Sequence, residues 1–450
     1  MAIKQARRAI AILLGFILVG AGCRPAVSPT PVLGPAPPLP TLLPTAAVTP
    51  ATPTATTVVS LTHFPTASPT PSPTTEITPT LTPSPALKLL WRTTFAGPIG
   101  ALAVSGGQVF VGIGHGSPGP EAQGGADVGL VMALSAVNGE RLWTYDLWQR
   151  PMTTTAVSLQ AVGNTLLVGA CEGGLECRPC ASPCRVAALD PTSGQEQWRY
   201  ELLRDYLSPL TANAKAVAFG QGYGRALHVL ETASGRERWV FTDYGTGSIP
   251  APLIVSDTVY IYLPVGGFGE GTAVWAFDVA TGKERWQTRL GGQSSGHRPV
   301  VAGGNLYVII YELGGQRLVA LESATGRQRW TASPDFAQLD YRTIYADETP
   351  AGTVYAASGR LLYAFAAANG KLRWQGQIPC CGAIILGTIT QAETLYVFTN
   401  TQGVYALKSA NGMGLWHHDV TGEIVTFALE QGVIYLGTAD GQLYALVPAE

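Results

Sequence analysis

The chain has 450 residues, with 28 Lys and Arg side chains, 30 Asp and Glu side chains and a formal net charge of −2 at pH 7. Four of the basic residues and one of the acidic residues precede Leu87, so residues 87–450 carry 24 basic and 29 acidic side chains, a formal net charge of −5. An acidic segment without a run of basic residues argues against nucleic acid as a partner.

The N-terminus is typical of a secretion signal. Lys4, Arg7 and Arg8 form a basic start, and an uncharged, mostly apolar stretch follows from Ala9 to Gly22. A membrane-spanning helix needs about 20 apolar residues, and this stretch is shorter. We therefore expect residues 1–22 to be a cleaved signal peptide rather than a transmembrane helix.

The signal ends in Val19-Gly20-Ala21-Gly22-Cys23, which resembles the lipobox of bacterial lipoproteins. Gly20 departs from the leucine that is usual at its position. The resemblance implies cleavage before Cys23 and attachment of a diacylglycerol to its sulfur. We expect an extracytoplasmic protein anchored to the bacterial membrane by this lipid; the alternative is an ordinary secretory peptide followed by an unmodified cysteine.

Residues 23–86 have the composition of a disordered tether. They are rich in Pro, Thr and Ser, they hold 17 of the 33 prolines, and Arg24 and Glu76 are their only charged residues. Such a segment buries too little apolar surface to fold, and its prolines favour the extended polyproline II conformation. At about 3.1 Å per residue, a tether of this length could hold a domain well away from a membrane.

Residues 87–450 contain a motif that is repeated seven times. The copies are ALSAVNGERLW, ALDPTSGQEQW, VLETASGRERW, AFDVATGKERW, ALESATGRQRW, AFAAANGKLRW and ALKSANGMGLW. In every copy a glycine lies four residues before the final tryptophan. These tryptophans, 41 to 55 residues apart, are Trp143, Trp198, Trp239, Trp286, Trp330, Trp374 and Trp416.

Each repeat also contains four short apolar, alternating runs, such as AIILGTITQ, TLYVFTN, GVYALKSA and GLWHHD in the last complete copy. Four strands in about 40–50 residues are the signature of a β-propeller blade. We expect the glycine to form a tight hairpin with positive φ and the tryptophan to pack against the neighbouring blade. The tryptophans are therefore predicted to be structural and not catalytic.

The two ends of this region complete each other. An eighth copy of the motif starts at Ala445-Leu446 but stops before a tryptophan, whereas Trp91 has no motif before it. We predict that Lys88 to Phe95 forms the outer strand of the last blade and closes the ring. The predicted fold of residues 87–450 is all-β: an eight-bladed β-propeller of four-stranded antiparallel blades.

The motif resembles the tryptophan-docking repeat of the pyrroloquinoline-quinone (PQQ)-like propellers, most closely in Ala188–Trp198 and Ala276–Trp286. Its acidic position holds Ser135, Ala366 and Lys408 in three copies. One branch of the family comprises the quinoprotein dehydrogenases, which hold PQQ and calcium on the propeller axis. The other is non-enzymatic and is typified by the lipoprotein subunit of the outer-membrane β-barrel assembly machine. The chain is closest in kind to this second branch.

The irregular insertions gather on one face of the predicted propeller. In blades whose strands run from A (inner) to D (outer), the B–C and D–A connections share a face. The insertions GHGSPGPEAQGGADVG, CEGGLECRPCASPC, PVGGFGEG and PCC all fall in these connections. We therefore expect binding at this face.

The D–A connections lead into the inner strands, so their residues are expected to rim the axial mouth. The candidate binding residues are Trp148, Arg150, Tyr206, His297, Arg298, Asp340, Tyr341, Arg342, Cys380 and Cys381. Arginines and aromatics around a concave opening suit an anionic small molecule or a peptide. The alternative for each residue alone is that long polar side chains gather wherever an opening is wet.

Six cysteines remain apart from Cys23, an even number that favours disulfides in an exported domain. The candidates are Cys171, Cys177, Cys180, Cys184, Cys380 and Cys381. The first four share one connection, where two bridges would staple the loop. Zinc or an iron–sulfur cluster is the less favoured alternative, because their spacing is not a paired C-x2-C pattern. Six cysteines allow about 15 connectivities, so bridges from Cys380 or Cys381 to this loop stay open.

Cys380 and Cys381 are adjacent, as are the cysteines of a disulfide that lies against PQQ in quinoprotein alcohol dehydrogenases. No clustered residues match the calcium ligands, the tryptophan floor or the base of those enzymes. We expect a monomeric, non-catalytic scaffold or recognition module without a cofactor, which binds protein or peptide partners in the cell envelope. The alternatives are a PQQ- and calcium-dependent dehydrogenase and a sensor or glycan-binding propeller.

Overall fold

The computed structural model divides the chain into Met1–Pro69 and Thr70–Glu450, and every described residue lies in the second unit. The described residues are 76–77, 87–114, 129–148, 154–172, 183–202, 207–222, 225–243, 249–265, 271–294, 298–312, 315–333, 347–349, 352–379 and 383–449. Within these ranges all regular secondary structure is β-strand. None of the described residues forms a helix that could span a membrane.

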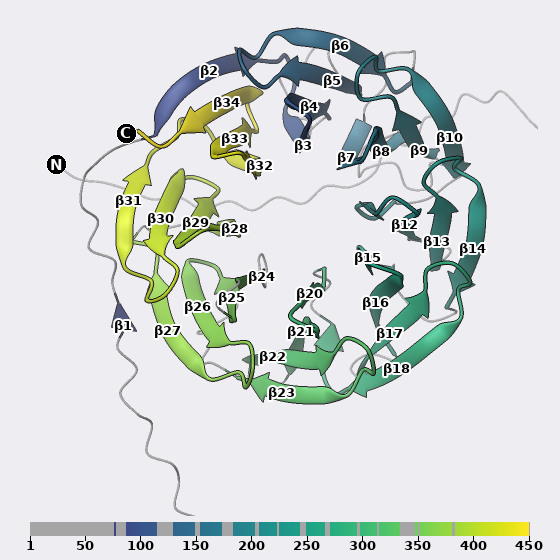
Figure 1. Ribbon diagram of the computed structural model, residues 1–450, viewed down its shortest axis with the longest axis vertical. Coiled ribbons are helices and arrows are strands. Elements are labelled where there is room, and N and C mark those ends of the chain that lie inside the picture. The colour runs from purple at the N-terminus through teal and green to yellow at the C-terminus, as the bar shows by residue number, and fades with distance from the viewer. Residues whose placement is uncertain are drawn as a thin grey trace, which may run out of the picture. The chain divides into compact units, whose positions relative to one another are not determined.

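The strands form eight antiparallel sheets arranged as the blades of a ring (Figure 1). Blade 1 consists of β3 (Ile99–Ser105), β4 (Gln108–Ile113), β5 (Leu130–Ser135) and β6 (Arg141–Asp146), and blade 2 of β7 (Thr154–Val162), β8 (Thr165–Glu172), β9 (Cys184–Leu189) and β10 (Glu196–Leu202). Blade 3 consists of β11 (Thr211–Ala212), β12 (Ala216–Gln221), β13 (Ala226–Glu231) and β14 (Glu237–Thr242), and blade 4 of β15 (Leu253–Val255), β16 (Thr258–Pro264), β17 (Thr272–Asp278) and β18 (Glu284–Leu290).

Blades 5 to 8 follow the same order from the axis outward. Blade 5 consists of β19 (Gln293–Ser294) with β20 (Val300–Ala302), β21 (Asn305–Glu312), β22 (Gly315–Glu322) and β23 (Gln328–Ala332), and blade 6 of β24 (Asp347–Thr349), β25 (Thr353–Ser358), β26 (Leu361–Ala366) and β27 (Leu372–Gln377). Blade 7 consists of β28 (Ile385–Gln391), β29 (Thr394–Thr399), β30 (Val404–Lys408) and β31 (Gly414–His418), and blade 8 of β32 (Ile424–Glu430), β33 (Val433–Thr438), β34 (Gln442–Val447) and β2 (Lys88–Thr94).

The ring closes through the two ends of the folded region, as the sequence predicts. β2 pairs antiparallel with β34, from Lys88 opposite Val447 to Thr94 opposite Gln442. β2 therefore supplies the outer strand of blade 8, and the eight-bladed fold predicted from the repeats is confirmed. One further short strand, β1 (Glu76–Ile77), pairs parallel with the outer strand β27 of blade 6.

The hydrophobic core is divided among the seams between blades. The two middle strands of a blade are buried on both sides, as β4 and β5 show, because neighbouring blades sandwich them. In β18, an outer strand, exposed residues intervene between buried ones, since one side of the strand faces solvent. The cluster at the seam between blades 8 and 1, for example, contains Tyr435 and Leu443 together with Val109 and Val111.

The repeated tryptophan and glycine meet across these seams. Seven indole N–H groups donate to a backbone carbonyl of the next blade, at 2.8 to 3.2 Å; the donors are Trp91, Trp143, Trp198, Trp239, Trp286, Trp330 and Trp374. Each of these rings also packs on the motif glycine of that next blade, where a Cβ atom would lie only 2.4 to 2.7 Å from a ring atom. The seven glycines have φ between 67° and 72°, a region that L side chains rarely adopt. Both the turn and the docked ring therefore require glycine.

The seam between blades 7 and 8 is built differently. Blade 8 takes its outer strand, β2, from the other end of the folded region, so no motif turn joins β34 to β2, and no described glycine packs on Trp416. Within the described part of the chain, the Trp416 indole donates no hydrogen bond. Phe398 of β29 instead stacks on Phe427 of β32, with ring centroids 4.1 Å apart and planes 8° from parallel.

Candidate binding face

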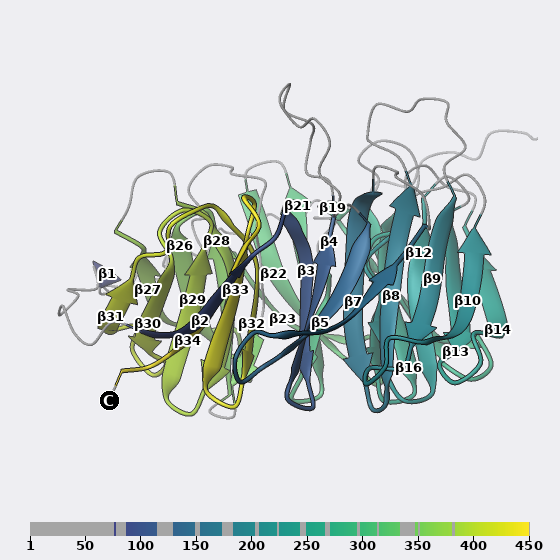
Figure 2. The ribbon, with the colours of Figure 1, turned by 90° about the horizontal axis from the view of Figure 1, so that it is seen from above.

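The short turns lie on one face of the ring. The A–B and C–D turns join the strands at the lower side in Figure 2, and the B–C and D–A connections join them at the opposite side. The predicted insertions fall in the second set, at residues 115–128, 173–182, 266–270 and 380–382, which lie outside the described residues. The same holds for Arg150, Tyr206, His297, Asp340, Tyr341, Arg342, Cys177, Cys180, Cys380, Cys381 and the lipid-attachment candidate Cys23. Their predicted roles stay predictions.

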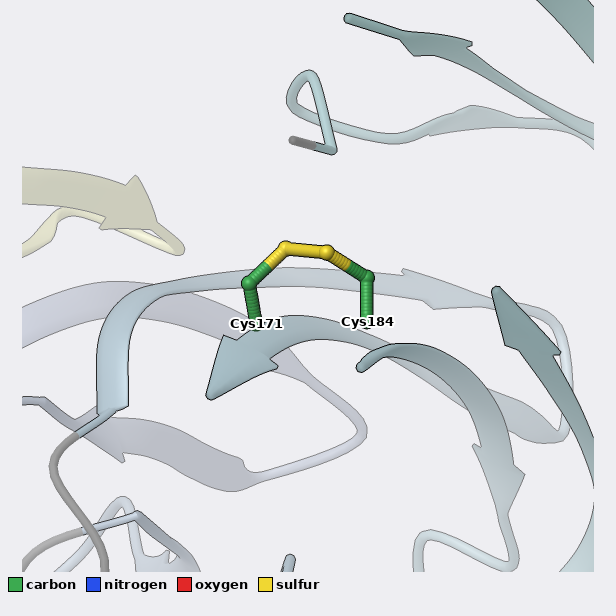
Figure 3. The surroundings of a disulfide bond; sticks show 2 residues. All are labelled: Cys171 and Cys184. Carbon is green, nitrogen blue, oxygen red and sulfur yellow. A yellow bond between two sulfur atoms is a disulfide. The ribbon is translucent and has the colours of Figure 1, made fainter. Parts of the chain in front are cut away.

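A disulfide stands at the base of the blade 2 connection. Cys171 of β8 and Cys184 of β9 lie directly opposite each other in the ladder, with their Cα atoms 4.0 Å apart, and their sulfurs are bonded (Figure 3). The bridge ties together the two ends of the connection over residues 173–182. Because both thiols are used in it, a metal site that needs all four clustered cysteines is excluded in this state.

Trp148, predicted at the axial mouth, is almost buried. Its residue is 9 % exposed, and the Arg185 guanidinium lies 4.8 Å from the centre of its ring. Arg185 donates to the Leu147 carbonyl and pairs with Glu201 at 2.9 Å. Arg185 thus covers the indole and leaves it little surface for a ligand. The sequence does not predict this contact, because Arg185 lies in a regular strand.

Arg298, the other described mouth residue, lies in the inner edge of blade 5 between β19 and β20 and is exposed. Its Nη2 donates to Oγ1 of Thr211 at 2.6 Å, although the two residues are 87 positions apart. Thr211 begins β11 in blade 3 and is 1 % exposed. The backbone N–H of Ile254 in blade 4 donates to the same oxygen at 3.1 Å. The Thr211 hydroxyl therefore joins three successive blades.

The surroundings of Arg298 lower its pKa, because nearby protein atoms desolvate the guanidinium. The residue is nevertheless exposed to solvent, so the desolvation of the guanidinium is partial. Sequence reasoning found Arg298 from its place before an inner strand but missed Thr211, since a threonine at a strand start is common.

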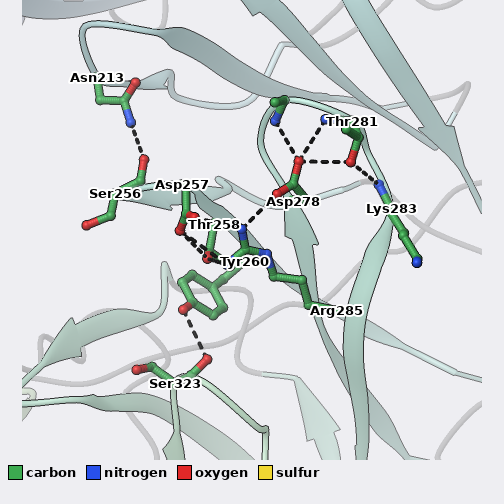
Figure 4. Close-up of polar contacts among 11 residues, drawn as sticks. Asn213, Ser256, Asp257, Thr258, Tyr260, Asp278, Thr281, Lys283, Arg285 and Ser323 are labelled. Carbon is green, nitrogen blue, oxygen red and sulfur yellow. Dashed lines mark hydrogen bonds and ion pairs between the residues drawn. The ribbon is translucent and has the colours of Figure 1, made fainter.

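The polar network of blade 4 is structural (Figure 4). Arg285 pairs with Asp257 at 2.8 Å and with Asp278 at 2.7 Å, and Tyr260 donates to the Ser323 carbonyl at 3.1 Å. Hydrogen bonds from Arg285 and Thr281 lower the pKa of Asp278 to about 2. Asp278 occupies the acidic position of the repeat, and its Oδ1 accepts from the Ala280 and Thr281 N–H groups of the following turn.

A second set of polar contacts links blades on the outer wall. Tyr145 donates to Glu196 of the next blade, and burial together with this carboxylate raises the pKa of Tyr145 to about 12. Tyr200 donates in the same way to Glu237 at 2.5 Å, which also lies 3.0 Å from Nδ1 of the buried His228. These partners satisfy one another, so the contacts fasten blades together and leave no free group for a ligand.

The resemblance to quinoprotein dehydrogenases raises the question of calcium. Among the residues that the structure describes, no three His, Cys, Asp or Glu side chains are grouped so that they could hold a metal ion. The described carboxylates of blade 4 are engaged with Arg285 and with turn N–H groups. The described residues therefore do not fit a calcium site of the kind that those enzymes use.

The chain matches the family model described as "Outer membrane protein assembly factor BamB" over residues 87–239, 182–264 and 224–446. Among solved structures it is similar to BamB from Moraxella catarrhalis (17 % identity, 80 % of this chain, 99 % of that chain, TM-score 0.57). It is also similar to quinohemoprotein alcohol dehydrogenase from Comamonas testosteroni (14 %, 80 %, 76 %, 0.58) and to Sqt1 from Saccharomyces cerevisiae (8 %, 81 %, 100 %, 0.60).

No curated protein matches the chain. At these identities the solved structures establish the fold alone. The family match spans the whole ring and confirms the resemblance that the repeated motif predicts. The chain therefore belongs to the PQQ-like propeller family whose model is described as outer membrane protein assembly factor BamB.

Proposed function

We propose that the protein is a non-catalytic scaffold or recognition module of the cell envelope. The observation that carries this proposal is the match of the whole ring to the family described as an outer membrane protein assembly factor. In this proposal the protein binds partner proteins or peptides on the face of the B–C and D–A connections, and a lipid on Cys23 holds it at the membrane through the segment 23–86.

The architecture supports such a role physically. Seven docked tryptophans and the pairing of β2 with β34 fix the blades relative to one another. A ring whose blades are fixed in this way needs little reorganisation when a partner binds, which favours recognition. The turns of the opposite face are shorter and offer fewer side chains for contact.

Site-specific photo-crosslinking in cells of the native host tests the proposal. A photoreactive residue at Val425, 43 % exposed at the start of inner strand β32, reports on the side of the D–A connections. The matched control is Glu393, which is exposed in the A–B turn of blade 7 on the opposite face. We expect a discrete envelope protein crosslinked from Val425 and none from Glu393. Crosslinks from Glu393 alone, or from neither position, would contradict the proposal.

The lipid anchor has its own test. Mass spectrometry of the mature protein should find a diacylglycerol on Cys23 as the first residue, and Cys23→Ser should release the protein from membranes. An unmodified Cys23 in a membrane-free protein would contradict this part.

The dehydrogenase is the second candidate, because a quinohemoprotein alcohol dehydrogenase shares the fold. It predicts turnover of alcohols or sugars after incubation with PQQ and calcium. A sensor or glycan-binding propeller would instead bind a small ligand without turnover, and a glycan array separates it from a protein scaffold.

A further inference from the structure

Thr211 and Arg298 carry hydrogen-bond donors for which the described residues supply no acceptor. The Thr211 Oγ1 atom accepts one bond from Arg298 and one from the Ile254 N–H. A hydroxyl oxygen has two lone pairs and one proton, so both lone pairs are used and the proton must point elsewhere. No described residue accepts that proton. A buried hydroxyl in this state leaves a donor to be satisfied by a ligand or by water.

Arg298 likewise has N–H donors for which the described residues supply no acceptor. A guanidinium carries five N–H donors, and one bond to Thr211 is the contact that the described residues make with it. No Asp or Glu among the described residues pairs with it, in contrast to Arg285, which lies between two carboxylates. The positive charge of Arg298 is therefore not neutralised by the described part of the chain.

The donors of Arg298 and Thr211 lie close together, although they come from different blades. The side chain of Arg298 leaves blade 5 and reaches the first residue of β11 in blade 3, where Ile254 of blade 4 also arrives. Arg298 precedes inner strand β20, on the side of the D–A connections, whereas Thr211 and Ile254 lie two residues before the A–B turns of their blades and therefore further along the axis. Arg298 is exposed and Thr211 is buried, so a ligand meets the guanidinium first and the hydroxyl lies behind it.

We propose that Arg298 and Thr211 form an anion site at the axial mouth that takes the carboxylate group of a ligand. A carboxylate carries one negative charge, which matches the single guanidinium, and two oxygens, which can accept from Arg298 and from the Thr211 hydroxyl. This inference rests on the proposed function, because it names the ligand chemistry of the same face. The carboxylate can come from a small organic acid or from an acidic peptide.

Calorimetric titration of the full chain, purified in detergent, tests the site with defined probes. The probes are succinate and an N-acetylated, C-terminally amidated pentapeptide of Asp, and their uncharged counterparts are succinamide and the same capped pentapeptide of Asn. Binding of either acid, but not of its counterpart, is expected, and raising the salt concentration should weaken it. Succinate binding alone identifies a small-acid site, and binding of the peptide alone identifies a peptide site.

The variants Arg298→Gln and Arg298→Lys assign the effect. Loss of a charge-assisted hydrogen bond should weaken binding about tenfold or more in Arg298→Gln, whereas Arg298→Lys keeps the charge and should retain part of the affinity. The matched control Arg289→Gln removes the same charge from the exposed outer strand β18 and should bind like the wild type. Circular dichroism establishes that each variant is folded.

Absence of binding by the wild type, or equal binding by folded Arg298→Gln, would overturn the site. A partner crosslinked from Val425 without carboxylate binding would overturn this inference and leave the proposed function standing. Carboxylate binding without any crosslinked envelope protein would do the reverse.

Discussion

The seam between blades 2 and 3 and the seam between blades 7 and 8 solve the same packing problem in different ways. At the first, the Trp198 indole donates to the Thr232 carbonyl and its ring packs on Gly235, while Tyr200 reaches Glu237. At the second, Trp416 has no following motif, and Phe398 stacks on Phe427 nearer the axis. The repeat thus acts between consecutive copies, and the last seam depends on contacts that the repeat does not encode.

The largest effect is expected from removing the strand that closes the ring. A chain that begins at Pro98 lacks β2 with the nearly buried Trp91, lacks the adjacent Phe95, and leaves β34 as an open edge. Losing a buried tryptophan alone costs about 3–5 kcal/mol, so the free energy of unfolding should fall by at least that amount. Urea unfolding followed by tryptophan fluorescence measures the loss against a chain that begins at Leu87. Equal midpoints would show that β2 does not stabilise the ring.

The next effect concerns the docking glycine. In Gly235→Ala the new Cβ atom would lie 2.4 Å from the Trp198 ring, and φ is 67°. We expect a loss of about 2–4 kcal/mol from the clash and the backbone strain together.

The matched control is Gly304→Ala, where φ is 78° and no atom lies within 4 Å of the added Cβ. It carries the backbone strain alone and should lose about 1 kcal/mol. Similar losses in both variants would contradict the docking role of the glycine.

A smaller loss in the free energy of unfolding is expected from replacing Trp198 or Trp416 by phenylalanine, and the two losses should differ. Trp198→Phe keeps an aromatic ring but removes the N–H that donates to Thr232, which should cost about 1–2 kcal/mol. Trp416→Phe, at the seam without a docking motif, should cost less than half as much. Chemical denaturation of the two variants side by side checks this order, and a larger loss in Trp416→Phe would reverse our view of the last seam.

The smallest effect is a dependence on pH. Arg285 and Thr281 lower the pKa of Asp278 from 3.8 to about 2, so its contribution to stability is complete above about pH 4 and disappears as the pH falls toward 2. Asp278→Asn should therefore lower stability by about 0.5–1 kcal/mol at pH 7 and leave it unchanged near pH 2. Thermal unfolding over this pH range provides the measurement. A constant difference between variant and wild type would contradict it.

The sequence predicts the ring well because the repeat is both local and periodic. Trp91 without a motif and Ala445-Leu446 without a tryptophan indicate the closure by themselves, and β2 pairs with β34 accordingly. The pairing of Cys171 with Cys184 was one of several open possibilities, since the spacing of four cysteines in one loop does not define partners.

The mouth was predicted only in part. Arg298 is recognisable from its place before an inner strand, but its bond to Thr211 joins blades 3 and 5 across 87 residues. Such a contact depends on the angle between blades, which no local pattern encodes. Trp148 shows that a residue predicted at the mouth can be covered by another side chain. The position of Trp148 in the sequence places it at the mouth, but Arg185 of a neighbouring blade covers its ring.

The central claim is that this propeller recognises partners without the quinone chemistry of its structural relatives. A calorimetric titration of PQQ into the full chain in the presence of calcium tests this claim most directly. We predict no saturable binding, and the same result with Asp278→Asn as a folded control. Stoichiometric binding with a dissociation constant in the micromolar range or below would contradict the account and make the protein a candidate dehydrogenase.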